Sequence, residues 1–134
     1  MSTSKIIVVG SSNTDMIIKL DKIPVPGETV IGGNFSMAAG GKGANQAVAA
    51  ARAGGDVTFI ASVGKDSFGA QAIEGFSKDG INVDYIKTID NVASGVALIF
   101  VDKHSENSIA VASGANSHLT PEHMITLKPL ISQA

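Results

Sequence analysis

The sequence contains no cysteine, so it offers neither a disulfide nor a thiolate site, an absence that fits a cytoplasmic location. It also lacks an excess of positive charge. Ten Lys and Arg against twelve Asp and Glu give a net charge of −2, which argues against nucleic acid and anionic membrane as partners. Long hydrophobic runs are missing too, because the apolar run at residues 6–9 is too short for a signal-peptide core or a membrane span. The three histidines have no recognisable metal-ligand spacing, and we expect no metal site.

The remaining composition is that of one folded domain. Hydrophobic residues make up 44% and charged residues 16% of the 134 residues, which is typical of a soluble globular chain. A chain of this size buries roughly two-thirds of the surface that it exposes when unfolded. The sequence shows no linker, internal repeat or low-complexity segment. Any function must therefore be sought in its motifs.

The most informative stretch is the glycine loop, residues 40–43, which leads into an alanine-rich segment ending at Ala53. Glycines permit positive φ angles and close approach of another molecule, and a helix that starts here directs its first N–H groups back into the turn. Lys42 and the nearby Asn45 add a cationic donor and an amide. Such a corner suits a polyhydroxylated or anionic ligand. The alternative is a glycine-rich turn that only lets a helix pack tightly.

Spacing excludes two common meanings of a glycine-rich loop. The phosphate-binding pattern GxxxxGK[ST] needs Gly at 36 and Ser or Thr at 43, whereas the chain has Ser36 and Gly43. The dinucleotide-binding pattern GxGxxG needs Gly at 46, where the chain has Gln46, and the turn after Gly10 fails the same test. The loop therefore belongs to neither class.

Apolar runs and the glycines or prolines that interrupt them predict the order of strands and helices. Strands are expected at 5–10, 16–20, 28–35, 57–63, briefly within 81–89, at 96–101 and at 108–112. Helices are expected from about 44 to 53, from 67 to 78 with Ser67 as N-cap, and from Thr120 to Ala134 with Thr120 as N-cap. The alternation of strands and helices predicts an α/β fold with a parallel central sheet.

Two pairs of strands have no helix between them. One pair lies within about 16–36 and the other within 95–112, and each is expected to form a hairpin. Two hairpins inserted into an α/β chain can combine into one small extra sheet, and we expect that arrangement.

Polar residues that follow the first strand can meet the glycine loop. Asn13 and Asp15 stand at that strand end, and Lys42 and Asn45 stand in or just after the loop. A carboxylate accepts hydrogen bonds from two sugar hydroxyls, while Lys and Asn donate to others. The alternative is that Asp15 only caps a turn and Asn13 only tolerates a left-handed backbone. On spacing alone the two interpretations are equally good.

Several motifs, in this order, resemble the ribokinase family of sugar kinases over essentially the whole chain. The most specific of them is Gly-Gly-Lys-Gly-Ala-Asn-Gln-Ala at 40–47. The others are Gly-Ser-Ser-Asn-Thr-Asp at 10–15, Pro-Gly-Glu-Thr at 26–29, Val-Gly-Lys-Asp at 63–66, Phe-Gly at 68–69, Ser-Gly-Val-Ala at 94–97 and Gly-Ala-Asn at 114–116.

The resemblance implies a Rossmann-like ribokinase fold, with a central parallel sheet, flanking helices and a small β-sheet lid that closes over ribose and pairs with the lid of a second subunit. It implies transfer of the ATP γ-phosphate, with magnesium, to the 5-hydroxyl of D-ribose or a related pentose. The family's ribose-contacting positions correspond to Asn13, Asp15, Gly41, Lys42 and Asn45. Its apolar lid positions correspond to Ala97, Ile99 and Val111.

The chain also departs from the family pattern. Family members are considerably longer, and the second signature, a glycine turn with the catalytic Asp base, is absent, as are the nucleotide pocket and the monovalent-cation loop. The sequence is therefore expected to be the amino-terminal, sugar-binding half of a kinase, with no catalytic base of its own and no strong binding of ATP or magnesium. We expect no phosphorylation of ribose by this chain alone. The alternative is a non-catalytic fragment that self-associates through lid or edge strands.

Overall fold

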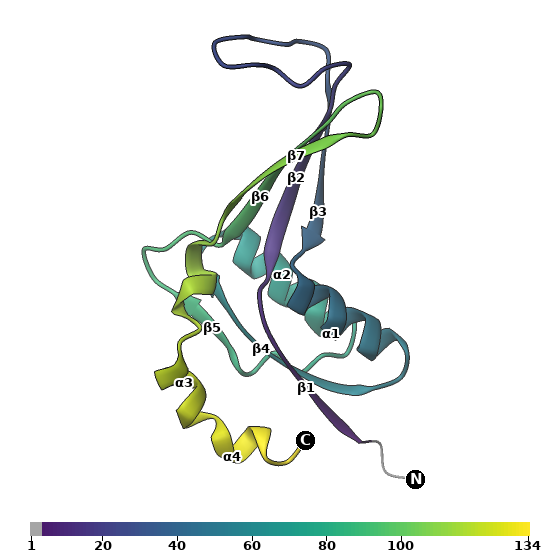
Figure 1. Ribbon diagram of the computed structural model, residues 1–134. Coiled ribbons are helices and arrows are strands. Elements are labelled where there is room, and N and C mark those ends of the chain that lie inside the picture. Colours follow the sequence, from purple (N-terminus) through teal and green to yellow (C-terminus); the bar gives the residue numbers. More distant parts are fainter. Residues whose placement is uncertain (1–3) are drawn as a thin grey trace.

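Two separate β-sheets organise the computed structural model, which describes residues 4–134 (Figure 1). The first is parallel and has the strand order β1-β4-β5. Its strands are β1 (Lys5–Val9), β4 (Asp56–Gly64) and β5 (Ile86–Ile89). The helices α1 (Lys42–Arg52) and α2 (Ser67–Lys78) pack against it. The predicted α/β class and parallel sheet are confirmed.

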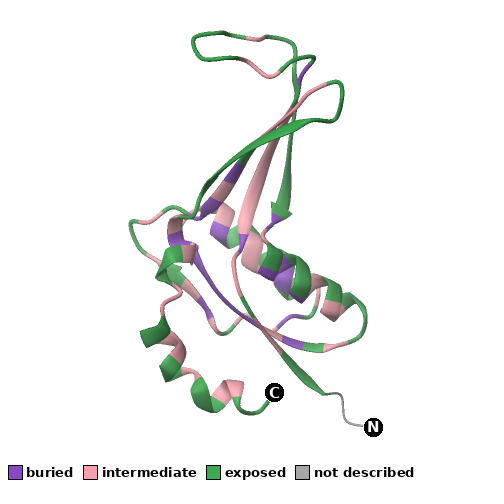
Figure 2. Ribbon diagram, viewed as in Figure 1, coloured by how far each residue is buried: buried purple, intermediate pink, exposed green. Residues whose placement is uncertain are grey.

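The hydrophobic core lies between β4 and the two helices. Alternate residues of β4 face α1 and α2 because successive side chains of a strand point to opposite sides. Phe59 of β4 meets Phe76 of α2 edge to face, with ring centroids 5.2 Å apart and an interplanar angle of 89°. Ala44 and Ala47 of α1 are almost fully buried, and their small side chains let the helix backbone come close to the sheet. The buried side of α1 is therefore a packing surface (Figure 2).

The two helices begin and end close to the predicted positions. Gly54 and Gly80 follow α1 and α2 with φ angles of 97° and 78°, as expected for glycines after a helix end. The prediction that Ser67 caps α2 is wrong by one residue. The N-cap is Asp66, whose side chain accepts a hydrogen bond of 2.8 Å from the Gly69 N–H.

The second sheet has four strands in the order β3-β2-β6-β7, so the two predicted hairpins do combine into one sheet. Its strands are β2 (Asn13–Lys19), β3 (Asn34–Gly40), β6 (Gly95–Val101) and β7 (Asn107–Ala112). The pairs β2–β3 and β6–β7 are antiparallel, whereas the central pair β2–β6 is parallel. In Figure 1 this sheet extends away from the helices, and in Figure 2 β3 and β7 are exposed along most of their length.

The predicted strand at 28–35 is wrong, because β3 begins only at Asn34. The backbone between β2 and β3 is irregular. Gly32 has a φ of 109° there, an angle that a regular strand does not use, and the side chain of Ile31 is 92% exposed. Apolar character at 28–35 therefore did not indicate a paired strand. The strand that pairs with β2 runs on to Gly40 and leads directly into α1.

The C-terminal segment is also more broken than predicted. After a 3₁₀ helix at Gly114–His118, α3 (Pro121–Thr126) and α4 (Lys128–Ile131) replace the single helix expected up to Ala134. Thr120 is the N-cap of α3, as predicted, and its hydroxyl accepts a 3.3 Å bond from the His123 N–H. Pro129 explains the break, because proline has no N–H to donate and its ring crowds the preceding turn. Among residues 4–134, no helix combines the length and hydropathy needed to cross a bilayer.

Candidate functional site

The glycine loop packs directly against the segment that follows β1. A Cβ atom added to Gly43 would lie 2.7 Å from the Cα atom of Gly10, so no larger residue fits without moving backbone. The N–H of Ala44 donates a 3.0 Å hydrogen bond to the Ser11 carbonyl. Gly41 has a φ of 97° and lies beside the backbone of Ser11 and Asn13. The loop thus packs α1 tightly against the segment that follows β1, and it places backbone without side chains beside Ser11 and Asn13.

Asp15 points toward this loop from β2. A Cβ atom on Gly40 would collide with both carboxylate oxygens of Asp15, which places the carboxylate against the bare backbone of the loop. The side chain is partly exposed. Among residues 4–134, no ion pair involves Asp15. A carboxylate in this position keeps acceptor capacity for a hydroxyl group.

Asn13 is fixed by a residue that sequence reasoning did not select. The Nδ2 of Asn116 lies 2.8 Å from the Oδ1 of Asn13, and the Oδ1 of Asn116 accepts a 2.9 Å bond from the Ser12 N–H. Asn116 belongs to the Gly-Ala-Asn motif at 114–116, so the motif was visible, but its contact with Asn13 was not. The two asparagines are 103 residues apart in the chain.

The apolar positions Ala97, Ile99 and Val111 share a face of the four-stranded sheet with Asp15. Ala97 pairs with Asp15 across β2–β6 and with Val111 across β6–β7, and directly paired residues place their side chains on one face. Ile99 lies two residues further along β6 and returns to that face. Ala97 is 5% exposed, whereas Val111 is 57% exposed. A carboxylate and an apolar surface therefore stand side by side.

Lys42 and Asn45 belong to the first turn of α1, next to the loop. Both are exposed, and the backbone N–H of Asn45 donates a 2.9 Å bond to the Gly41 carbonyl. Among residues 4–134, no side-chain hydrogen bond or ion pair joins Lys42 or Asn45 to Asn13 or Asp15. The structure thus brings Asn13, Asp15 and Gly41 together, and places the other two at the helix start beside them.

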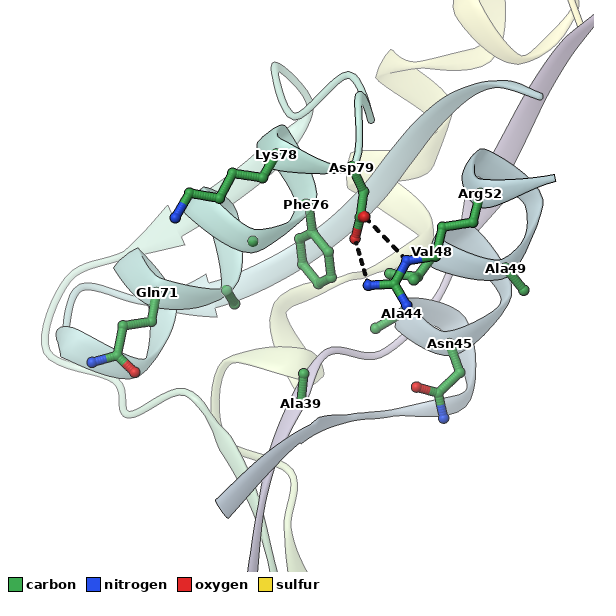
Figure 3. Close-up of a pocket in the computed structure, with 12 residues that line it drawn as sticks. Ala39, Ala44, Asn45, Val48, Ala49, Arg52, Gln71, Phe76, Lys78 and Asp79 are labelled. Atoms are coloured by element: carbon green, nitrogen blue, oxygen red, sulfur yellow. Dashed lines mark hydrogen bonds and ion pairs between the residues drawn. The ribbon is translucent and has the colours of Figure 1, made fainter. Parts of the chain in front are cut away.

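Two grooves adjoin this region, and the larger one is not centred on it. A groove of about 630 Å³ runs between α1 and α2, with Asn45 toward one end and an Arg52–Asp79 ion pair across it (Figure 3). The two hydrogen bonds of that pair are 3.1 Å and 3.3 Å long. A smaller groove of about 210 Å³ is lined by Asn13 and by residues of β3 and α2. Only the smaller groove reaches the strand that carries Asp15.

A second polar cluster joins β4, α2 and β6 around Asp66. Its Oδ1 accepts bonds of 2.8 Å from the Gly69 N–H and 2.7 Å from the Ser94 hydroxyl, and its Oδ2 accepts a 2.8 Å bond from the Ser94 N–H. Burial raises the pKa of the Asp66 carboxyl, but the bonds from Ser94 and Gly69 outweigh this effect and hold the pKa below its ordinary value. With both oxygens bonded to Gly69 and Ser94, the Asp66 carboxylate joins the start of α2 to the start of β6.

No group of three or more His, Asp or Glu side chains is placed to hold a metal ion within the described range 4–134. The polar groups near the glycine loop are amides, one carboxylate, one lysine and backbone N–H groups. Such a set can bind hydroxyls through hydrogen bonds.

Comparisons with known proteins agree with this chemistry. The sequence matches the profile of the pfkB family carbohydrate kinases over residues 3–134. It is 50% identical over 113 residues to a ribokinase of Haemophilus influenzae, a match covering 84% of this chain and 37% of the relative. It is 43% identical over 117 residues to a deoxyribokinase of Salmonella typhimurium, covering 87% of this chain and 38% of the relative. The chain thus spans less than half the length of these relatives.

The fold is shared as well. The structure of Arabidopsis thaliana ribokinase complexed with ribose and ATP superimposes with a TM-score of 0.77 at 33% identity, covering 87% of this chain and 38% of that one. The chain therefore shares its fold with this ribokinase, as the sequence motifs indicated. From the profile match over nearly its whole sequence and from these relatives, the chain belongs to the pfkB family of carbohydrate kinases.

Proposed function

We propose that this chain forms the sugar-binding part of a ribokinase, and that its ligand is D-ribose or a closely related pentose. The observation that carries the proposal is the shared sheet face on which Asp15 stands next to Ala97, Ile99 and Val111, directly beside the glycine loop. Pentoses present hydroxyls on their rim and C–H groups on their faces. One carboxylate next to an apolar surface matches both features.

Each side chain has a distinct task in this proposal. Asp15 accepts hydrogen bonds from two hydroxyls, and the backbone N–H groups around Gly41 donate to a sugar oxygen. Asn13, Lys42 and Asn45 supply further donors from β2 and from the first turn of α1. The apolar trio Ala97, Ile99 and Val111 covers the carbon face of the sugar, so that the four-stranded sheet acts as a lid.

In the complete reaction, the sugar 5-hydroxyl oxygen forms a bond to the γ-phosphorus of ATP, the bond to ADP breaks, and the hydroxyl proton passes to a base. The resemblance to ribokinases implies that ATP is used together with magnesium and a monovalent cation. The described residues do not fit magnesium, because no carboxylate cluster is present among them and both oxygens of Asp66 are bonded within the fold. We therefore assign no chemical step to them and expect the 134-residue chain alone not to phosphorylate ribose.

A second candidate is a fragment without catalysis that associates with itself. Exposed apolar side chains on both faces of the four-stranded sheet favour it: Phe35 is 65%, Leu98 46% and Ile109 54% exposed. Apolar surface of this kind is typical of a protein contact. The two candidates are compatible as long as the sugar remains accessible.

Calorimetric titration of the chain with D-ribose tests the proposal. Saturable binding of D-ribose, with weaker binding of a hexose, supports a pentose site. A parallel assay with ATP and Mg²⁺ should release no ADP in the presence of ribose. Absence of any sugar binding by a folded chain would contradict the proposed site, and ATP-dependent turnover would contradict the expectation that this chain alone does not phosphorylate ribose.

A further inference from the structure

The orientation of the Asn13 amide can be read from its hydrogen-bond partners. Ser12 fixes the first assignment, because its backbone N–H can only donate. The atom of Asn116 that lies 2.9 Å from this N–H must therefore be the carbonyl oxygen Oδ1. The other terminal atom of Asn116 is then the amide nitrogen Nδ2.

The same reasoning extends from Asn116 to Asn13. The Nδ2 of Asn116 donates at 2.9 Å to the Ser113 carbonyl and at 3.2 Å to the Ser12 carbonyl, so its surroundings are those of a donor. It lies 2.8 Å from one terminal atom of Asn13, and that atom must accept. The atom is Oδ1, which leaves the NH₂ group of Asn13 on the side away from Asn116.

Gly95 provides the space for this pair of amides. Gly95 pairs directly with Asn13 in the β2–β6 register. A Cβ atom on Gly95 would overlap the Nδ2 of Asn116 and the Oδ1 of Asn13. Any side chain at position 95 would therefore separate the two asparagines.

We propose that Asn116 is a positioning residue that holds Asn13 with its NH₂ group toward the ligand. This inference rests on the proposed sugar site. Asn13 is then a donor only, two residues before Asp15, which is an acceptor only. The ligand must accept a hydrogen bond from Asn13 and donate one to Asp15. A neutral polyol satisfies both, because each hydroxyl can do either, whereas an anionic group can accept from Asn13 but has no proton to give to Asp15.

The substitution Asn116→Asp tests the inference most sharply. It keeps an oxygen for the Ser12 N–H, but it replaces the donor that faces Asn13 with an acceptor. The Asn13 amide should then rotate, so that its NH₂ group faces the introduced carboxylate and its carbonyl faces the ligand. Asn107→Asp makes the same chemical change at the exposed start of β7 and serves as the matched control.

The first measurement needs no ligand. In the wild-type chain, NMR should show slow solvent exchange for the Asn116 side-chain NH₂ protons and fast exchange for those of Asn13. In Asn116→Asp, the Asn13 protons should become the slow ones, whereas Asn107→Asp should leave the Asn13 rate unchanged. Slow solvent exchange of the Asn13 NH₂ protons in the wild type would overturn the proposal, whether or not ribose binds. An unchanged Asn13 exchange rate in Asn116→Asp would overturn it as well.

The second measurement is D-ribose affinity in a double-mutant cycle. Asn116→Asp should weaken binding about tenfold in the wild-type background, because the sugar hydroxyl that accepts from Asn13 must turn its hydrogen toward the rotated carbonyl and lose its previous acceptor. In an Asn13→Ala background it should have no further effect. An equal loss in both backgrounds would show that Asn116 acts only on the fold. If the wild type binds no ribose, the proposed sugar site fails, while the exchange rates still decide the orientation of Asn13.

Discussion

Asp15 makes the most direct prediction at the scale of single residues. Its carboxylate lies against the bare backbone at Gly40, and it is the proposed acceptor for two sugar hydroxyls. We expect Asp15→Asn to weaken D-ribose binding about tenfold to somewhat over a hundredfold, because hydrogen bonds to a charged group are worth about 1.5–3 kcal/mol. Calorimetry measures the change. Asp84→Asn, an exposed position on the loop before β5, should bind as the wild type does. Equal affinity of Asp15→Asn and wild type would make Asp15 a turn former.

Asp66 leads to a prediction about stability. Its carboxylate caps α2 and binds both the N–H and the hydroxyl of Ser94, so it links α2 to the start of β6. Replacing Asp66 with Ala removes the cap and leaves the N–H groups of Gly69 and Ser94 without their partner. We expect the free energy of unfolding to fall by about 1–3 kcal/mol. Urea unfolding at pH 7 measures this free energy. A loss for Asp66→Ala no larger than that for Asp84→Asn would contradict the prediction.

The same residue predicts a pH dependence. The pKa of Asp66 is lower in the folded chain than its ordinary value, so the folded state binds the proton less readily than the unfolded state. The stabilisation is therefore complete above the unfolded pKa of about 3.9 and is lost as the pH falls through the lower folded pKa. The difference in stability between wild type and Asp66→Ala should shrink below about pH 4. A difference that stays constant down to about pH 2.5 would show that the carboxylate charge does not matter.

Asn116 shows where residue-level prediction from the sequence stopped. Asn13, Asp15, Lys42 and Asn45 could be selected because each stands next to a strand end or in the glycine loop. Asn116 and Asn13 are 103 residues apart, and no local pattern connects them. Only the packing of the 3₁₀ helix at Gly114–His118 against β4 and β6 brings Asn116 to Ser12 and Asn13. The cap of α2 was misplaced for a smaller reason, since Asp66 and Ser67 are both good N-caps and are adjacent.

Two glycines within helices provide a matched pair at the scale of elements. Gly43 lies in the first turn of α1 and touches the Gly10 backbone, whereas a Cβ atom on Gly75 in α2 would meet nothing within 4 Å. We expect Gly75→Ala to stabilise the chain by about 0.5–1 kcal/mol through helix propensity. Gly43→Ala should destabilise it by about 1–3 kcal/mol, because α1 must move away from β1. Thermal unfolding of both variants measures the effect. Equal shifts of the melting temperature would show that α1 does not depend on the close contact between Gly43 and Gly10.

Most elements could be predicted because their apolar runs are either continuous and buried or periodic. The failures have physical causes. Residues 36–40 carry Ser, Met, Ala and Gly, which are not typical strand formers, and they form part of β3 because β2 offers hydrogen-bonding partners. The single helix predicted after Thr120 ignores Pro129, which signals the break between α3 and α4. The union of two hairpins into one sheet was predictable, but the parallel direction of β2 and β6 was not, because strand direction depends on contacts distant in sequence.

At the scale of the whole molecule, exposed apolar surface predicts self-association. Met37, Leu98 and Met16 lie on one rung of the four-stranded sheet, and Met37 and Leu98 are nearly half exposed. The strand β1 also lies at the edge of the parallel sheet among the described residues. Open edges and apolar faces favour pairing with another chain. We expect light scattering at micromolar concentration to show a dimer or larger species.

A charged substitution distinguishes the surfaces. Leu98→Lys should shift the chain toward the monomer if the four-stranded sheet makes the contact, whereas Thr88→Lys on β5 serves as the control. A wild-type chain that is monomeric and melts in one cooperative transition would contradict self-association. If Leu98→Lys has the same molecular mass by light scattering as the wild type, the contact must involve β1 or another exposed surface.

The parallel pairing of β2 with β6 also has a consequence for the order in which the chain acquires structure. During synthesis, β2 and β3 leave the ribosome long before β6, and a two-stranded hairpin is only marginally stable in water. The Ser12 N–H can form its hydrogen bond only after Asn116, 104 residues further along the chain, has been synthesised. Contacts of such large sequence separation form slowly. The orientation of Asn13 and the protection of the open edge of β2 therefore arise together, as late steps of folding.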